Sequence, residues 1–343
     1  MPATGVEHDS YEEMNVSIII PVYQVAPYIK DCLKSVMCQT YTGSMECLIV
    51  DDCGSDESIA IAEQMIAAYD GPIRFKILHH EQNWGLSAAR NTGTMQAKGE
   101  YLYYLDSDDE MTEGCIETLM GQMTAHPGLE MVQGNAIRYF PSNRSVVDVK
   151  QVSLPLAVSN EEVRRCFYQH KQMRVNVWNK LIRRDLVVDN NILCLEGVLY
   201  EDNLWSFDLL KVLKHAGFIS EITYHHRVRP DSIMTSTDKR TKILNYCTIY
   251  REILTHLTLG HEQEEFDYFV KIVGFIYLKY GHDVPECKDV MNLCREQSKR
   301  YCAFGSRMSF EVIYFLGKFK YGWVLWALAR KVKHLVKLGN NYN

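Results

Sequence analysis

The sequence lacks several features that mark particular classes of protein. Its 343 residues include 11 cysteines but no CxxC pair. Its apolar runs stop short of the roughly 18–20 residues that a membrane-spanning helix needs. Basic residues are not in excess, since 37 Lys and Arg stand against 43 Asp and Glu and leave a net charge of -6. We therefore expect neither a disulfide framework nor a nucleic-acid partner.

The first 15 residues are polar and acidic, without the apolar segment of a signal peptide. We expect residues 1–15 to be a flexible extension, and the protein to be cytoplasmic with free thiols. Cys287, Cys294 and Cys302 recur at about two helical turns, a spacing that favours one face of a helix over a zinc site.

Strand and helix patterns alternate through the first 140 residues. Residues 16–22 (VSIIIPV) form a nearly continuous apolar run, which is typical of a strand buried on both faces. The same reasoning predicts strands at 47–50, 73–78, 101–105 and 131–139, with helices at 27–38, 55–68 and 86–97 and another capped by Thr112. Such units predict an α/β fold with a mainly parallel sheet and helices on both faces.

The later part of the chain changes character. Ser159 and Glu162 form a capping box for a short helix, and a second helix is predicted at 201–216, followed by a strand at 218–226. From about residue 238 onward nearly all signals are helical. We therefore predict an α/β domain over 16–236 and a helical C-terminal region over 237–343.

Two of the predicted strands end in acidic residues. Asp51 and Asp52 follow the second strand, and the sequence DSDD at 106–109 follows the fourth. Ligands bind outside the carboxyl ends of parallel strands, so we expect these carboxylates to converge on one rim. Acidic turns are common, but this placement favours a site for Mg²⁺ or Mn²⁺, which would offset the charge of a leaving diphosphate.

Residues 83–91 (NWGLSAARN) open a predicted helix whose N-terminal amide groups favour anions. Arg90 in this segment either reaches a phosphate or braces an acidic loop, and the sequence leaves both readings open. A carboxylate at the end of the second strand can accept hydrogen bonds from a base N–H or from ribose hydroxyls.

Seven segments, in their order along the chain, resemble the family 2 inverting glycosyltransferases, whose fold is usually called GT-A. The resemblance rests on residues 18–23 (IIIPVY), 50–56 (VDDCGSD), 83–91, 97–100 (AKGE), 105–109 (LDSDD), 178–181 (WNKL) and 196–202 (EGVLYED). These segments span roughly residues 16–236 and are quite specific together. Cys53 and Gly54 depart from a commoner Gly-Ser pair in the acidic loop.

The resemblance implies transfer of one sugar from a nucleotide-sugar, a UDP-sugar first of all, to an acceptor hydroxyl with inversion. The acceptor would be a glycan or a lipid-linked molecule, and the reaction would belong to polysaccharide or lipid-linked glycan synthesis. On the donor side, the resemblance implies Pro21, Tyr23 and Asp52 at the nucleobase, Asp106 near the ribose, and Asn83 and Arg90 elsewhere on the donor. For the metal it implies Asp108 as the main ligand, with Asp106 beside it and His225 or His226 as a further ligand. It places Trp178 and Lys180 on the acceptor side and makes Glu201 and Asp202 the catalytic pair.

A physical argument for Asp202 stands beside the resemblance. Direct displacement at the anomeric carbon needs a base on the face opposite the leaving diphosphate. A carboxylate at the start of the predicted helix is stabilised there by the helix dipole. The alternative is that Glu201 and Asp202 only cap this helix, and a purely structural role is equally open for the two histidines.

The last residues of the chain are rich in Lys and Arg. Trp323 and Trp326 interleave with bases such as Lys331 and Lys333. This pattern is typical of a helix lying on an anionic membrane surface, which would make the protein peripheral on the inner face of the membrane. A helix packed on the rest of the protein remains the alternative.

Two other functions are alternatives to the transferase. A nucleotidyltransferase would need a glycine-rich, basic phosphate loop after the first strand, where residues 21–24 (PVYQ) offer none. A non-catalytic nucleotide-sugar-binding protein would not need both Asp108 and Asp202.

Overall fold

The computed structural model describes residues 15–140, 151–229, 238–281, 283–301 and 311–316. The chain divides into two compact units, the first made of 1–197 with 208–229 and the second of 198–207 with 230–343. The predicted extension, apart from Asn15, lies outside the described residues, and so does the basic, tryptophan-containing end of the chain. The predicted domain boundary at 236/237 stays a prediction.

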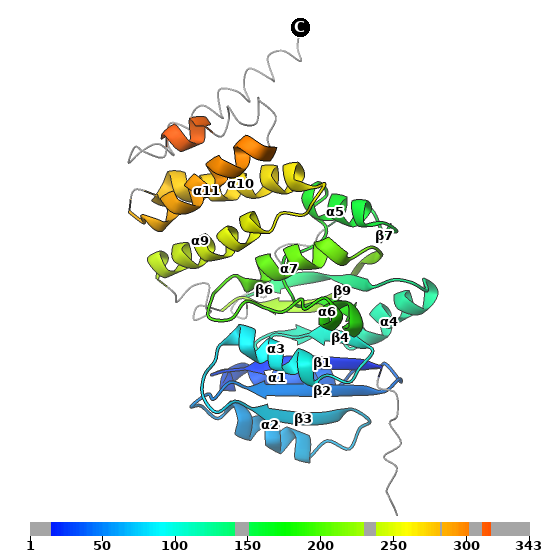
Figure 1. Ribbon diagram of the computed structural model, residues 1–343. Helices are drawn as coiled ribbons and strands as arrows, with labels where there is room; N and C mark the ends of the chain where they lie inside the picture. The colour runs from blue at the N-terminus through cyan, green and yellow to red at the C-terminus, as the bar shows by residue number, and fades with distance from the viewer. Residues whose placement is uncertain (1–14, 141–150, 230–237, 282, 302–310, 317–343) are drawn as a thin grey trace, which may run out of the picture. The chain divides into compact units, whose positions relative to one another are not determined.

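A nine-stranded sheet is built from the described residues of the first unit (Figure 1). Its strands are β1 (Val16–Val22), β2 (Met45–Asp51), β3 (Arg74–His79), β4 (Tyr101–Tyr104), β5 (Glu110–Met111), β6 (Met131–Tyr139), β7 (Leu156–Ala157), β8 (Lys180–Arg183) and β9 (Ala216–Arg227). Their spatial order is β3-β2-β1-β4-β8-β6-β9-β5, with β7 beside β9. The α/β fold class predicted from the sequence is confirmed.

The sheet has a parallel half and a mixed half. β3, β2, β1 and β4 are parallel neighbours, as the alternating pattern predicts. All seven residues of β1 are buried, because strands flank it on both sides and helices cover parallel sheets. Beyond β4 the prediction of a mainly parallel sheet fails: β8 runs antiparallel to β4 and β6, although β6 and β9 are again parallel. The four-residue β8 is too short to show a period in the sequence.

Helices connect the strands of the first unit. They are α1 (Ala26–Met37), α2 (Ser58–Ala67), α3 (Leu86–Gln96), α4 (Cys115–Ala125), α5 (Asn160–Tyr168) and α6 (Arg184–Asp189), and α7 (Glu201–Val212) runs from the second unit into the first. α1 buries Ile29, Leu33 and Val36, which recur at helical spacing. α3 packs tightly on β1 at Gly93, where an added Cβ would lie only 2.4 Å from the Ile19 side chain.

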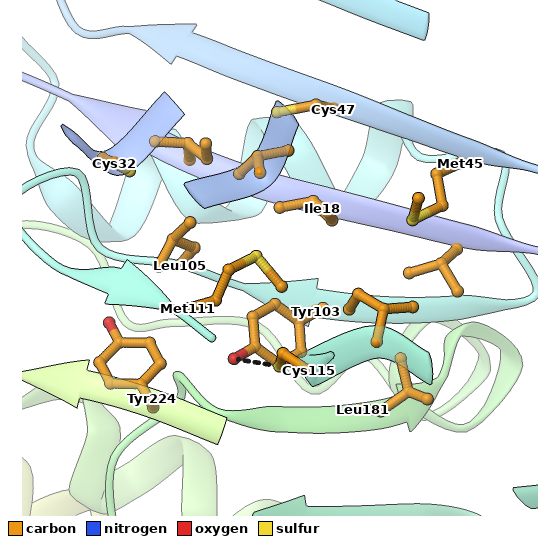
Figure 2. Packing of buried hydrophobic residues seen from close by; sticks show 14 of the residues in the cluster. Ile18, Cys32, Met45, Cys47, Tyr103, Leu105, Met111, Cys115, Leu181 and Tyr224 are labelled. Atoms are coloured by element: carbon orange, nitrogen blue, oxygen red, sulfur yellow. Dashed lines mark hydrogen bonds between the residues drawn. The ribbon is translucent and has the colours of Figure 1, made fainter. Parts of the chain in front are cut away.

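The core of the first unit lies between the sheet and its helices. Figure 2 shows Ile18 and Cys47 from β1 and β2 in this core, together with Leu181 from β8. Tyr103 is fully buried, and the thiol of Cys115 donates to its hydroxyl oxygen at 3.3 Å. The core therefore continues from the parallel half of the sheet into the mixed half.

The described part of the second unit is helical, as predicted for the C-terminal region. Its further helices are α9 (Lys239–Thr255), α10 (Glu262–Tyr280) and α11 (Glu286–Tyr301), which lie side by side (Figure 1). Cys287 and Cys294 are buried on α11, consistent with a helix face, while Cys302 lies outside the described residues. None of the described helices combines the length and apolar character that crossing a membrane would require.

Several predicted boundaries differ from the structure. The helix predicted at 201–216 stops at Val212, because β9 begins at Ala216. Ser159 caps α5 as predicted, its hydroxyl accepting from the Glu162 amide at 3.3 Å, but the Glu162 carboxylate accepts from the Val158 amide at 2.8 Å. α4 begins at Cys115, three residues after the predicted cap. Such shifts at helix ends are small and leave the order of elements unchanged.

Candidate active site

Asp51 and Asp52 lie where β2 ends, and their surroundings differ. Asp52 is buried, and its two carboxylate oxygens accept from the Trp84 and Gly85 amides, both at 2.8 Å. The Nδ1 atom of His80 also lies 2.8 Å from Asp52 Oδ1. In this structure Asp52 therefore holds the 83–85 loop from inside, an arrangement that does not favour the predicted contact with a nucleobase.

Asp51 occupies the more accessible position at this strand end. Its Oδ2 lies 2.9 Å from Nδ1 of His79, an exposed side chain, and its Oδ1 accepts from the Cys53 amide at 3.1 Å. Tyr23, at the neighbouring end of β1, is 44% exposed, whereas Pro21 is buried within β1. Asp51 pairs with Val22, the residue before Tyr23, across the β1–β2 ladder. It is therefore the accessible carboxylate at the strand end beside Tyr23.

The 83–91 segment enters α3 through a glycine. Gly85 has φ of 93°, a conformation that L side chains rarely adopt, and it precedes the first residue of α3. Asn83 and Trp84 are exposed, and the Trp84 ring lies 4.5 Å from the His80 ring. The Asp52 carboxylate and Gly85 together shape this helix entrance.

Arg90 and Asn91 join α3 to two other parts of the first unit. Arg90 is buried, and its Nη2 donates to Asp106 Oδ1 at 2.7 Å. The structure thus shows Arg90 bracing the acidic loop, one of the two readings left open by the sequence. Asn91 donates to Glu196 Oε1 at 3.0 Å and accepts from the Cys194 amide at 2.8 Å, so it anchors the loop that leads toward residues 201–202.

The DSDD segment forms a tight turn after β4. The Asp109 amide donates to the Asp106 carbonyl at 3.0 Å, which closes the turn. Asp106 and Asp108 stay partly exposed, with 23% and 20% of their side chains accessible. Asp108 Oδ2 accepts from Nε of Arg229 at 2.6 Å. β2 and β4 both run parallel to β1, so their acidic ends share one edge of the sheet as predicted.

Asp109 is the buried anchor of this turn. Its carboxylate accepts from the Tyr224 hydroxyl at 2.8 Å and from the Arg227 amide at 2.7 Å, both on β9. Burial raises the pKa of Asp109 to about 6, although the hydrogen bond with His226 acts in the opposite direction. Burial alone would lower the pKa of His226, but the hydrogen bond and charge of Asp109 outweigh it and raise that pKa. The turn is therefore fixed to β9.

The two predicted histidines point to different surroundings. His226 Nδ1 lies 3.3 Å from Asp109 Oδ2, and the His226 ring stacks on Trp178 at 5.4 Å. His225 is one residue away on β9 and packs edge-on against Tyr139, where burial lowers its pKa. Successive residues of a strand face opposite ways, so the structure brings His226 to the acidic turn but not His225.

In the segment 178–180 (WNK), Trp178 is partly exposed, whereas Asn179 and Lys180 are buried. Trp178 is partly buried and stacks on Tyr224 with ring centroids 4.3 Å apart. Asn179 adopts φ of 59° and is fully buried, with its side chain bonded to the Gly134 carbonyl at 3.0 Å. Lys180 is also fully buried, and its ammonium donates to the Asn176 carbonyl. Lys180 therefore supports this segment from inside, which disagrees with the predicted contact on the acceptor side.

The acidic turn fits a divalent cation of the kind predicted. Among the described residues, no three His, Cys, Asp or Glu side chains are arranged to hold a metal by themselves. Mg²⁺, however, binds through one or two carboxylates and completes its shell with phosphate oxygens and water. Asp106 and Asp108 are two partly exposed carboxylates on one turn, which is the donor set that such a site requires.

Glu201 and Asp202 begin α7 in the second unit. Glu201 is buried, whereas Asp202 is only partly buried. Asp202 Oδ1 accepts from the side-chain amide of Asn203 at 2.9 Å. Of the predicted catalytic pair, Asp202 is therefore the more accessible carboxylate, and its role as base stays a prediction.

Several residues that support the site were assigned no role from the sequence, although Asn91 and Asn179 lie within recognised segments. Arg229 pairs with Asp108 across 121 residues of chain, a separation that no local pattern reveals. Asn91, Asn179 and Asn203 act through side-chain hydrogen bonds, which depend on tertiary position. Asn179 offers one retrospective clue, because Asn tolerates the left-handed conformation better than most residues.

Comparisons with known proteins agree with this architecture. The family model described as "Glycosyl transferase family 2" matches residues 17–188, half of the chain. An uncharacterized glycosyltransferase, YibD of Escherichia coli (strain K12), is 28% identical over 69% of this chain and 68% of its own length. A second one, EpsJ of Bacillus subtilis (strain 168), is 29% identical over 64% of this chain and 62% of its own. The chain thus spans about two thirds of these relatives.

A solved structure shares the fold. TarS 1–349 of S. aureus, in a crystal structure with UDP-GlcNAc, superposes with a TM-score of 0.66 at 18% sequence identity. The similarity covers 88% of this chain and 90% of that one.

Proposed function

Because the chain belongs to glycosyl transferase family 2, we propose that it moves one sugar from a UDP-sugar donor to an acceptor hydroxyl with inversion at the anomeric carbon. The observation that carries this proposal is the shared edge of β2 and β4, where Asp51, Asp106 and Asp108 are the accessible carboxylates. TarS, which has the same fold, was crystallised with UDP-GlcNAc, and this supports a UDP-sugar as donor.

The donor would lie along the edge formed by the ends of β1, β2 and β4. Tyr23 offers an exposed ring for the base, and Asp51 offers a carboxylate for a base N–H or a ribose hydroxyl. Arg90 holds Asp106 in place, and Arg229 holds Asp108. These arginines also reduce the repulsion between the acidic turn and a diphosphate.

We expect Asp106 and Asp108 to bind Mg²⁺ or Mn²⁺, with His226 as a further ligand through Nε2, since its Nδ1 faces Asp109. A bound cation would neutralise the charge that develops on the leaving diphosphate. The chain's own contribution is to fix the turn, through the Asp109 bonds to Tyr224 and Arg227. Trp178, stacked on Tyr224, is the partly exposed group that we place toward the acceptor.

Asp202 would act as the base. It would take the proton of the acceptor hydroxyl while that oxygen bonds to the anomeric carbon and the bond to the diphosphate breaks. Its accessibility, compared with the buried Glu201, supports this assignment. A glycan or lipid-linked acceptor stays a proposal. A peripheral position at an anionic membrane surface rests on residues outside the described ranges, and binding to anionic liposomes tests it.

The decisive experiment measures turnover and donor affinity in parallel for Asp202→Asn and Glu201→Gln, with UDP-sugars as donors. Asp202→Asn cannot accept a proton, and loss of a general base typically costs about 10²–10⁴ in rate. Donor affinity should be unchanged, because the proposed donor contacts lie on the first unit. An inactive Glu201→Gln beside an active Asp202→Asn would move the base by one residue. A product that retains the donor's anomeric configuration would exclude single displacement.

A further inference from the structure

A chain of hydrogen bonds leads to Asp202 from the interior of the second unit. The Tyr250 hydroxyl on α9 donates to Asn203 Oδ1 at 3.3 Å, and Asn203 Nδ2 donates to Asp202 Oδ1 at 2.9 Å. We propose that Asn203 is a positioning residue that aims and stabilises the Asp202 carboxylate, and that Tyr250 sets the orientation of the Asn203 amide. This inference rests on the proposed role of Asp202 as base.

The orientation of the Asn203 amide decides whether it helps or opposes Asp202. A carboxamide has one end that donates and one end that accepts. A flipped Asn203 would place its carbonyl oxygen against the Asp202 carboxylate, where two acceptors repel each other. Tyr250 is almost fully buried, and the hydroxyl proton that it donates binds the oxygen end of the amide. The nitrogen end is thereby directed to Asp202.

The backbone before α7 provides a second constraint on Asn203. Tyr200 has a left-handed backbone conformation, with φ of 68°. Its carbonyl group faces Asn203. That carbonyl accepts from the Asn203 amide N–H at 3.1 Å and from Asn203 Nδ2 at 3.2 Å. The two hydrogens of Nδ2 thus serve Tyr200 and Asp202, so the side chain has little freedom to turn.

Helix α9 holds the whole arrangement from one side. Asn245 accepts from the Leu199 amide at 2.7 Å, which fixes the loop before Tyr200. The Tyr246 ring stacks on Tyr200 at 3.9 Å and on Tyr250 at 6.0 Å. Tyr246 and Tyr250 are four residues apart, so they share one face of the helix.

Three titratable side chains of the described residues feel the charge of Asp202, and they are these same tyrosines. Glu201 is its neighbour in the chain. Burial raises the pKa of Tyr200, Tyr246 and Tyr250, and the negative charge of Asp202 raises each of them further. The three hydroxyls therefore stay neutral over the working pH range. They can donate to a neighbour but cannot compete with Asp202 as bases.

A capping role alone would also place Asn203 at the start of α7, so the test needs a readout that capping does not change. Loss of a donor to a carboxylate disfavours its ionised form, and the base must be ionised to act. If Asn203 positions Asp202, its loss therefore moves the acidic limb of the pH–rate profile toward higher pH. A purely structural role would lower stability and leave this limb in place.

The experiment measures kcat and KM across pH for the full chain with Asn203→Ala and with Tyr250→Phe, alongside thermal unfolding. We expect kcat to fall about tenfold or more in Asn203→Ala, with donor KM unchanged and the acidic limb shifted upward. Tyr250→Phe removes only the hydroxyl, and a smaller change in the same direction is expected.

The control variant is Tyr314→Phe. The Tyr314 hydroxyl donates to Asn292 Oδ1 at 2.8 Å in the same unit, so this substitution removes an equivalent tyrosine–asparagine bond that does not lead to Asp202. The profile of Tyr314→Phe should match the wild type. Unmoved acidic limbs in both Asn203→Ala and Tyr250→Phe overturn the inference, provided that Asp202→Asn is inactive. An active Asp202→Asn instead refutes the proposed base itself, which separates the two failures.

Discussion

The two acidic strand ends of the first unit look alike in sequence but differ in how their carboxylates are used. At the end of β2, 15% of the Asp51 side chain is accessible, against 3% for Asp52. At the end of β4, about a fifth of the Asp106 and Asp108 side chains is accessible, against 1% for Asp109. The end of β2 therefore has one open and one buried carboxylate, and the end of β4 has two open carboxylates and one buried carboxylate.

Neighbouring acids therefore have different roles: the buried ones bind adjacent parts of the chain, and the open ones remain available to a ligand. The buried Asp52 binds the entrance of α3, and the buried Asp109 binds β9. The Asp109 bonds fix the turn that carries Asp106 and Asp108, and the Asp52 bonds tie the residue after Asp51 to the start of α3. An active-site acid needs such support, because a donor or metal must meet it in a defined place. We expect substitutions at the open positions to impair activity, and those at the buried positions to impair stability.

The largest effect is expected for Asp108→Ala at the open end of β4. If Asp108 is the main metal ligand, as proposed, its loss should reduce transfer at least about 10³-fold, since a bound cation would supply several kcal/mol at the transition state. Its pairing with Arg229 is partly exposed, so the free energy of unfolding should change by less than about 1 kcal/mol. Transfer assays and urea unfolding measure the two quantities.

Asp185→Asn is the matched control for Asp108→Ala, because Asp185 also follows a strand and pairs with an arginine, Arg183, at 3.0 Å. Its activity should equal that of the wild type. Full activity of the wild-type protein after chelation and dialysis would contradict a metal at Asp108.

A smaller effect, on stability and not on activity, is expected for Asp52→Ala at the buried position after β2. The change leaves the Trp84 and Gly85 amides and His80 without their acceptor, so the free energy of unfolding should fall by about 3 kcal/mol. Chemical denaturation of the purified variant measures it. If the variant unfolds like the wild type and only loses donor affinity, Asp52 binds the donor and the division between open and buried acids is wrong.

The smallest effect is expected for Asp51→Asn. Loss of one charged acceptor should weaken binding of the nucleoside diphosphate about tenfold, with stability nearly unchanged. Calorimetric titration with UDP provides the measurement. Equal affinity in Asp51→Asn and the wild type would remove Asp51 from the donor site.

Much of this architecture could be predicted from the sequence. The apolar run of β1 and the alternation of strands and helices identify the parallel half of the sheet, because burial on both faces leaves a continuous apolar pattern. The short strands β5, β7 and β8 were not predicted, since two to four residues show no period. β8 nevertheless converts the sheet from parallel to mixed.

The candidate site was predicted at the level of segments. The acidic ends of β2 and β4 were placed on one edge correctly, because parallel strands on either side of β1 must end together. Which acids at each strand end are open was not predictable, because Asp51 and Asp52, for example, differ only in the neighbours that surround them in space. The buried position of Lys180 was missed for the same reason.

The sequence by itself thus determined the α/β class, the family and the strand ends that carry the acids, since these depend on local periodicity and on residue order. Only the tertiary structure decided which side chains act as supports. Arg229 reaches Asp108, Asn91 reaches Glu196, and Tyr250 reaches Asn203 across long stretches of chain. The physical reason is that a hydrogen bond depends on distance and direction in space, and the packing of distant elements sets both.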